Sequence, residues 1–246
     1  MQEVRLLREP SGSPAWNLAL DEALLAGDEP VVRFYGWDPP GLSLGYFQKH
    51  DELPLQPLVD DGFVVVRRPT GGGAIAHVGE LTFALADRVG GVFFSENIEL
   101  GYRRVHRAVA AALQHLGADS QAREQHPVES DQSDQGWLCF YKSSSVDLVA
   151  NDRKLLGSAQ RRTRGRVLHH GSLPLQPNPV TPRAISVAEL ATEPVSWDGV
   201  ADQLVAALQD EFDIRLRVAT PTAAEACRAE QIMASRYSNP SWTRRR

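Results

Sequence analysis

Apolar residues recur at helical spacing in four stretches of the chain. The first begins at Ser13 and Pro14, a good N-cap followed by a proline that is tolerated at the first helical position, and Gly27 ends it. The clearest helix is predicted from about residue 98 to 116, with an apolar face and with Gly117 after its last turn. Two later helices are predicted, one through Val200, Leu204, Leu208 and Phe212 and one from Thr222 to Ser235.

Short apolar runs bounded by turn residues predict the strands. The run Phe63–Val66 is entirely apolar, and Asn151-Asp152 is typical of a tight turn between two strands. From Gln121 to Gly136 the chain is polar and aperiodic, so we expect a surface loop there. The predicted strands are 31–35, 42–46, 63–66, 81–86, 137–141, 146–150, 154–156, 167–170 and 214–218.

Helices and strands are mixed without a strict strand–helix–strand rhythm. The sequence has no internal repeat, and no Pro/Ser-rich linker divides it. We therefore expect one α/β domain over residues 1–246, built on a largely antiparallel sheet.

Composition restricts the class of protein. Of the 246 residues, 42% are hydrophobic and 23% are charged, as in soluble globular proteins, and the net charge of −5 argues against nucleic-acid binding. No apolar run approaches the roughly 18 residues that a membrane helix needs, and the N-terminus lacks the pattern of a signal peptide. Two distant cysteines cannot build a disulfide framework, so we expect a cytoplasmic protein without membrane association.

Three consecutive glycines follow the strand predicted before residue 67: Gly71, Gly72 and Gly73. Glycine permits positive φ angles, and successive bare N–H groups suit a carboxylate, a phosphate or an acyl oxygen. Arg67 and Arg68 add positive charge before them, and His77 follows. A flexible turn is the alternative, but this combination favours ligand binding. The segment is neither a Walker A loop nor a Rossmann fingerprint.

Only three of the 26 basic residues are lysines. Lys154 follows the predicted tight turn, where a lysine is able to donate to a developing oxyanion or to hold a nearby thiol as its thiolate. Cys139 lies on the strand predicted before that hairpin, so adjacent antiparallel strands bring the two together. The alternatives are a surface lysine and a buried, unreactive cysteine. Cys227 is predicted to be a packing residue, and Lys49 and Lys142 to be surface residues.

The remaining polar clusters favour less specific roles. His169 and His170 are predicted to line a site, because no Cys, Asp or Glu stands at zinc-ligand spacing from them. The basic run Arg161–Arg166 fits a solvated loop or a clamp for an acidic protein partner. Arg244–Arg246 is predicted to be a solvated tail.

Four motifs, in this order, resemble the lipoate–protein ligase A / octanoyltransferase family: Asn17–Leu24, Arg67–Ala74 with His77, Arg153–Gln160 and Leu168–Leu173. The resemblance extends from about Val4 to the C-terminus. It implies the biotin/lipoate protein ligase catalytic-domain fold, a mixed, mostly antiparallel sheet flanked by helices. It also implies an acyl site with the substrate-binding residues Arg68, Gly71, Gly72, Gly73, His77, Gly157, Ser158, Ala159 and His170.

Two chemistries occur in this family. The transferases need no cofactor, whereas the ligases use ATP and Mg to make an acyl-adenylate and usually carry a C-terminal accessory domain. Segments 34–37 and 42–48 and the Cys139-Phe140 pair resemble the transferase branch, and too few residues follow Ile214 for an accessory domain. Gly71–Ala74 resembles the ligase form, so an ATP-dependent lipoate–protein ligase stays as the alternative.

The transferase resemblance implies a ping-pong reaction. Cys139 would take octanoyl from acyl carrier protein as a thioester, and Lys154 would contact the acyl carbonyl. The acceptor would be a lysine of a lipoyl domain, in a 2-oxoacid dehydrogenase complex or in the glycine-cleavage H protein. A third alternative is a non-catalytic module that binds an acylated partner, for which no cysteine is required.

Overall fold

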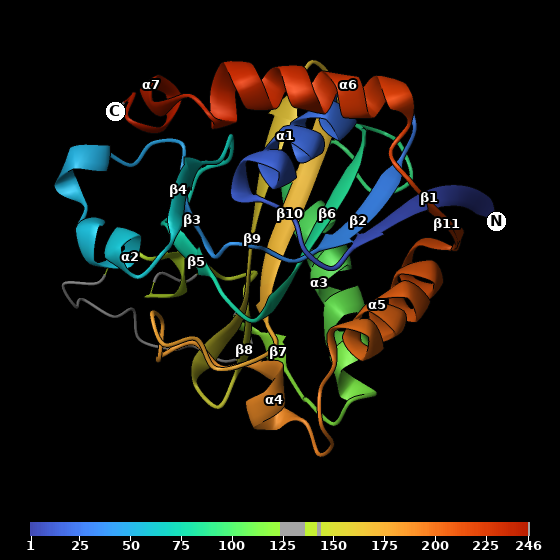
Figure 1. Ribbon diagram of the computed structural model, residues 1–246. Coiled ribbons are helices and arrows are strands. Elements are labelled where there is room, and N and C mark those ends of the chain that lie inside the picture. Colours follow the sequence, from blue (N-terminus) through green and yellow to red (C-terminus); the bar gives the residue numbers. More distant parts are fainter. Residues whose placement is uncertain (124–135, 142–143, 246) are drawn as a thin grey trace.

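The protein is described from a computed structural model that places residues 1–123, 136–141 and 144–245 (Figure 1). Its large sheet consists of β1 (Gln2–Glu9), β2 (Val31–Tyr35), β6 (Glu80–Arg88), β7 (Gln121–Ala122), β8 (Leu148–Ala150), β9 (Arg153–Thr163), β10 (Arg166–Pro174) and β11 (Ile214–Ala219). The strand order is β11-β1-β2-β6-β10-β9-β8-β7. Among the described strands of this large sheet, only the pairs β11–β1 and β1–β2 are parallel, which confirms the predicted mixed, mostly antiparallel sheet.

A second, three-stranded sheet lies beside the large one (Figure 1). It consists of β3 (Gly41–Leu44), β4 (Val64–Arg67) and β5 (Ile75–His77), in the order β4-β3-β5. The chain passes from β4 through the three glycines to β5. The small sheet therefore holds both ends of the glycine segment.

Helices cover both faces of the large sheet. On one face, α3 (Ile98–Gln114) and α5 (Trp197–Phe212) pack against residues such as Phe83 and Leu85; on the other, α1 (Pro14–Leu25) and α6 (Ala223–Ile232) pack near Ala84 and Ala86. This alternation along β6 is the period of two that a strand imposes. The shorter elements are η1 (His50–Glu52), α2 (Gln56–Asp60), η3 (Cys139–Tyr141), α4 (Val187–Leu190), η4 (Met233–Tyr237) and α7 (Pro240–Thr243).

The predicted helix ends are confirmed by their capping contacts. The Ser13 side chain accepts a hydrogen bond from the Trp16 backbone N–H, and Pro14 is the first helical residue of α1. Gly117 follows α3 with a φ of 71°, a left-handed value that favours glycine. Among the described residues, no helix combines the length and apolarity that a membrane crossing requires.

Two local predictions are wrong. Residues 137–141 do not form a strand, because a single bridge between Ala74 and Leu138 ties them to the glycine segment, and the chain then turns into η3. The basic run at 161–166 is not a loop but the end of the β9–β10 hairpin. Arg164 and Gly165 both have positive φ there and close a tight turn.

The remaining predictions concern the surface. Lys49 is exposed as expected, whereas Cys227 is exposed on α6 and not a packing residue. In the predicted solvated tail Arg244 is exposed, whereas Arg245 is half-buried, with its guanidinium 3.9 Å from the Tyr46 ring centroid and 4.2 Å from that of Trp242. The loop predicted at 121–136 begins with β7 and otherwise falls mainly on residues 124–135, which lie outside the described residues, as do Lys142 and Arg246.

A buried ion pair connects the first strands to α1. Arg33 is fully buried and donates to Asp21 at 2.8 Å and to Glu9 at 2.6 Å. It also donates to the backbone and side-chain oxygens of Asn17, each at 2.9 Å. The guanidinium of Arg33, on β2, thus replaces its lost hydration with acceptors from two other elements, β1 and α1.

Substituting Arg33 by methionine should lower the free energy of unfolding by about 3–5 kcal/mol, because Asp21 would stay buried without its partner. Urea denaturation at neutral pH measures the change. The control is Arg217→Met, which removes an exposed pair with Glu3 and should cost less than about 1 kcal/mol. Similar losses in the two variants would contradict the structural role given to Arg33.

Candidate active site

A cavity of about 450 Å³ lies between the two sheets, within the size range of small-molecule sites. The glycine segment, β3 and β5 form one wall, and β2, β6, β9 and β10 form the other. Its lining includes Cys139 and all but one of the substrate-binding residues expected from the sequence: Arg68, Gly71, Gly72, His77, Gly157, Ser158, Ala159 and His170.

The guanidinium of Arg68 fixes the shape of the glycine segment. It donates to the carbonyl oxygens of Gly71 at 2.7 Å and Gly73 at 2.6 Å, and to that of Ser43 at 2.7 Å. No carboxylate among the described residues forms an ion pair with it. Burial lowers the pKa of Arg68 to about 10, so the cavity wall still carries a positive charge at neutral pH.

The glycines have different roles. Gly72 has a φ of 92°, a value that favours glycine, and it borders the cavity. Gly73 does not line the cavity. A Cβ at Gly73 would lie 2.8 Å from the backbone nitrogen of Cys139, so glycine is required there for close contact with the cysteine segment. The expected triple-glycine ligand surface is therefore reduced to Gly71 and Gly72.

Arg67 points away from the cavity, which corrects the expectation that it adds charge to the ligand site. Its buried side chain donates to the carbonyl oxygens of Gly45 at 2.9 Å, Gln48 at 2.7 Å and Thr243 at 2.7 Å. It thereby joins the segment after β3 to α7. The side chains of Arg67 and Arg68 thus lie on opposite sides of the chain at the end of β4, and only that of Arg68 lines the cavity.

The structure brings the side chains of Cys139 and Lys154 together. Lys154 Nζ lies 3.8 Å from Cys139 Sγ and 3.3 Å from the Cys139 carbonyl oxygen. The lysine is placed by the start of β9 and the cysteine by η3. A Cβ at Gly157 would lie 3.2 Å from Lys154 Cε and 3.6 Å from Cys139 Sγ. The absence of a side chain at Gly157 therefore keeps the space beside the Cys139–Lys154 pair open to the cavity.

Asp147 completes this cluster. Its carboxylate lies 2.9 Å from Lys154 Nζ, and both side chains are buried. Burial by itself lowers the pKa of Lys154, but the charges of Cys139 and Asp147 outweigh it and raise that pKa above its ordinary value. Sequence reasoning missed Asp147, although a lone acid in the apolar run 146–150 was the available signal.

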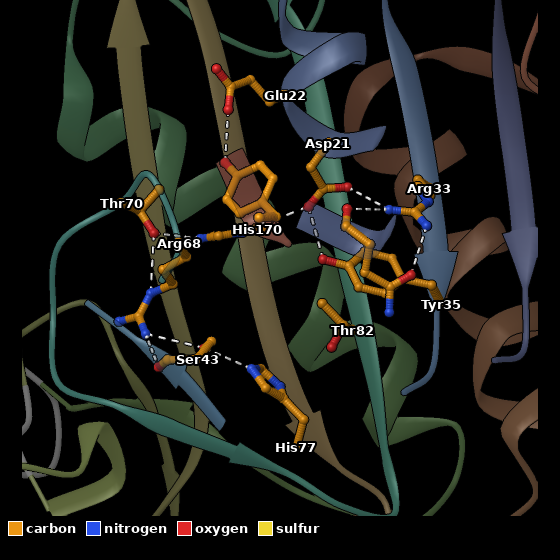
Figure 2. Close-up of polar contacts among 12 residues, drawn as sticks. Asp21, Glu22, Arg33, Tyr35, Ser43, Arg68, Thr70, His77, Thr82 and His170 are labelled. Carbon is orange, nitrogen blue, oxygen red and sulfur yellow. Dashed lines mark hydrogen bonds and ion pairs between the residues drawn. The ribbon is translucent and has the colours of Figure 1, made fainter. Parts of the chain in front are cut away.

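Two histidines in the cavity wall are fixed by hydrogen bonds that meet near Arg68 (Figure 2). His170 Nε2 lies 2.7 Å from Thr70 Oγ1, which also accepts from Arg68. His77 Nε2 lies 2.7 Å from Ser43 Oγ, a second Arg68 acceptor. The glycine segment, both sheets and the two histidines therefore form one connected polar network.

Acidic groups border this network on its far sides. Asp21 lies 3.8 Å from His170 Nδ1 (Figure 2). Glu80 accepts from His77 Nδ1 at 2.7 Å. Burial lowers the pKa of His170 below its ordinary value, although Asp21 acts in the opposite direction. His170 is therefore a neutral wall residue at neutral pH.

His169 does not line the cavity, contrary to expectation. The pleat of β10 turns it to the opposite face, where its ring is buried 4.9 Å from that of Tyr102 and 5.8 Å from that of His106. Within residues 1–123, 136–141 and 144–245, no group of three or more His, Cys, Asp or Glu side chains is arranged to hold a metal ion.

Comparison with known proteins identifies relatives of the whole chain. The family described as lipoyl protein ligase A/B catalytic domain matches residues 13–227. The octanoyltransferase LipM of Kyrpidia tusciae is 32% identical over 280 residues, covering 100% of both chains. The octanoyltransferase LipM of Geobacillus kaustophilus is 31% identical over 263 residues, covering 95% of each.

Solved structures with the same fold are lipoate-protein ligases. A lipoate-protein ligase A bound with ATP has a TM-score of 0.82 and 28% identity, with 99% of both chains covered. A bi-partite lipoate protein ligase of Thermoplasma acidophilum has a TM-score of 0.78 and 25% identity, with 99% of this chain and 97% of that chain covered. The fold implied by the sequence motifs is thus confirmed.

His106 supports the cavity wall from behind β9. Its Nε2 lies 2.6 Å from Ser158 Oγ, and its Nδ1 bonds the Val146 carbonyl oxygen. Burial lowers the pKa of His106 from its ordinary value of 6.5 to about 4. As the pH falls below 6.5, His106 becomes protonated in the unfolded chain, whereas in the folded protein it stays neutral until about pH 4. The free energy of unfolding therefore decreases between pH 6.5 and about pH 4.

His106→Gln should flatten the loss of stability between pH 6.5 and about 4, because glutamine keeps a hydrogen-bonding side chain but does not titrate. The slope of unfolding free energy against pH should decrease by up to about 1.4 kcal/mol per pH unit. Urea titrations at several pH values measure it. His115→Gln, at the exposed end of α3, is the control and should keep the wild-type slope; an unchanged slope in His106→Gln would contradict the prediction.

Proposed function

The chain belongs to the lipoyl protein ligase A/B catalytic-domain family, and from this membership we propose that it is an octanoyltransferase of protein lipoylation. It is an enzyme of a family in which acyl groups are attached to proteins. The observation that carries the choice of transferase is the thiol of Cys139, which borders the cavity 3.8 Å from the Lys154 ammonium. Adenylate chemistry does not require this thiol.

In the first half-reaction, the Cys139 thiolate attacks the octanoyl thioester of acyl carrier protein. The new carbon–sulfur bond forms as the bond to the carrier sulfur breaks, and the carrier leaves as a thiolate that takes up a proton. Lys154 supports this step in two ways, because its ammonium favours the thiolate and lies near the point where an oxyanion develops. Backbone amides near Gly72 and Gly157, which border the cavity, assist in holding the oxyanion.

In the second half-reaction, a lysine amine of a lipoyl domain attacks the acyl-enzyme. The amide bond forms, Cys139 leaves as the thiolate, and the amine loses a proton to water. The proposed acceptors are lipoyl domains of 2-oxoacid dehydrogenase complexes or the glycine-cleavage H protein. Neither half-reaction takes a cofactor, and the proposed setting is the cytoplasm. The similarity to two LipM octanoyltransferases, over 95% or more of each chain, supports this assignment.

A second candidate is an ATP-dependent lipoate–protein ligase. It is favoured by the similarity to a ligase A bound with ATP and by the Gly71–Ala74 segment. The buried cation of Arg68 and the exposed amides of a glycine segment are groups that suit a phosphate. Under this alternative, ATP and Mg²⁺ would supply the activation of free lipoate or octanoate, and Cys139 would be dispensable.

Cys139→Ala should abolish transfer of octanoyl from octanoyl-carrier protein to a purified lipoyl domain in the absence of ATP. Loss of the nucleophile removes the covalent route, so turnover should fall by at least about 10³-fold. Mass spectrometry of wild type with donor alone should show an octanoyl adduct on Cys139.

Cys227→Ala is the matched control, because this thiol is exposed on α6, away from the cavity lining. It should retain wild-type transfer and the adduct. Transfer that needs free lipoate and ATP and survives Cys139→Ala would replace the transferase by the ligase.

Lys154→Arg should lower turnover by about 10²-fold even though the charge is kept. The planar guanidinium directs its donors differently and does not fit the space between Cys139, Asp147 and Gly157. Steady-state transfer and the rate of Cys139 alkylation by iodoacetamide measure the two proposed roles. Lys49→Arg, at the exposed residue just before η1, should match wild type; near-normal turnover of Lys154→Arg would overturn the role of Lys154.

A further inference from the structure

The cavity reaches both sides of β9. Strand β8 pairs with the first residues of β9, up to Leu156, and from Gly157 onward the neighbour of β9 among the described strands is β10 alone. Tyr102 of α3 and Val146 line the cavity together with Gly71 of the glycine segment. One part of the cavity therefore lies on the glycine side of β9 and another on the side of α3.

Ser158 lies where these two parts meet. It borders the cavity directly after Gly157, at which a Cβ would lie 3.6 Å from Cys139 Sγ. Because successive side chains of a strand point to opposite faces, the Ser158 hydroxyl is directed toward α3. There, His106 Nε2 lies 2.6 Å from Ser158 Oγ. The hydroxyl is thus one residue from the contact with the cysteine.

Two hydrogen bonds of His106 decide in which direction the Ser158 hydroxyl donates. The Nδ1 atom of His106 bonds the carbonyl oxygen of Val146, and a carbonyl oxygen only accepts, so Nδ1 carries the proton. Burial lowers the pKa of His106 to about 4, so at neutral pH the ring is neutral and Nε2 is an acceptor. Ser158 therefore donates its one proton to His106, and the lone pairs of its oxygen are left for a ligand that donates.

The second half-reaction brings such a donor to the sulfur. The Lys154 ammonium is the donor for the acyl oxygen, whereas the attacking amine has N–H groups and needs an acceptor. The carboxylate of Asp147 is already bound to Lys154 Nζ at 2.9 Å and to the Ser144 backbone N–H at 2.7 Å, and Asp147 does not line the cavity. The amine nitrogen becomes positive as it bonds to the carbonyl carbon, and a hydrogen bond from a charged donor is stronger than one from a neutral donor.

We propose that Ser158 binds the amine of the acceptor lysine as it attacks the acyl-enzyme, and that His106 is the positioning residue that keeps the serine oxygen available as an acceptor. This inference rests on the proposed transferase function. One amine hydrogen bonds Ser158 Oγ, which directs the nitrogen lone pair to the carbonyl carbon. The nitrogen–carbon bond forms, the bond from carbon to Cys139 Sγ breaks, and the proton lost by nitrogen goes to water, because Ser158 keeps its own.

The test starts from isolated octanoyl-enzyme and compares two acceptors, a lipoyl domain and the thiol of the acyl-free carrier protein. A thiolate has no hydrogen to donate, so its attack does not use Ser158. In Ser158→Ala, the amine-to-thiol ratio of single-turnover rates, followed by mass spectrometry of the enzyme, should fall by about tenfold or more relative to wild type. His106→Leu should also lower the ratio, and His106→Gln, which keeps an acceptor for the hydroxyl, should lower it less.

Ser172→Ala is the matched control, because this serine lines the same cavity from β10 and its hydroxyl donates to Glu80. It should keep the wild-type ratio. An unchanged ratio in folded Ser158→Ala, or an equal fall in Ser172→Ala, would overturn the inference. If Ser158→Ala does not fold, an unchanged ratio in His106→Leu overturns it. Failure of wild type to form any octanoyl-enzyme would instead refute the transferase function, so the two failures are distinguishable.

Discussion

Three guanidinium groups removed from water, those of Arg33, Arg67 and Arg68, fix the segments that surround the cavity. A buried cation persists only where protein acceptors replace its hydration. Arg33 uses carboxylates and joins the first strands to α1, whereas Arg67 and Arg68 use backbone carbonyls on either side of β4. Because each carbonyl must stay within hydrogen-bond distance, irregular segments that carry the site are held in one conformation.

Local signals were sufficient for most elements of the fold. The range of β2 and the ends of α1 and α3 follow from apolar periodicity, a serine cap and a terminal glycine. The first strand, Gln2–Glu9, was not predicted, although its apolar residues alternate, because its parallel partners come from residues far along the chain. Residues 137–141 have the composition of a strand but find only one bridging partner, so tertiary context overrides their propensity.

The sequence was sufficient to predict most residues of the site, but not how these residues are arranged. Adjacent strands were expected to bring Cys139 and Lys154 together, yet the cysteine reaches the lysine from a short helix anchored on the glycine segment. Arg67 and Arg68 are adjacent residues of the same type, so the sequence does not distinguish their roles. Because successive side chains of an extended segment point to opposite sides, Arg67 connects the segment after β3 to α7, whereas Arg68 lines the cavity. Asp147 carried too little local signal, because its role depends on a lysine across the β8–β9 hairpin.

Asp147 also has a place in the proposed reaction that the free enzyme alone does not explain. When Cys139 is a thiolate, one ammonium faces two anions in a buried setting. Acylation removes the charge on sulfur and leaves Lys154 and Asp147 as a balanced pair, so the step relieves an excess of buried negative charge. The carboxylate then keeps the lysine charged and in place while sulfur no longer attracts it. The same ammonium is thereby ready to stabilise the oxyanion when the acceptor amine attacks.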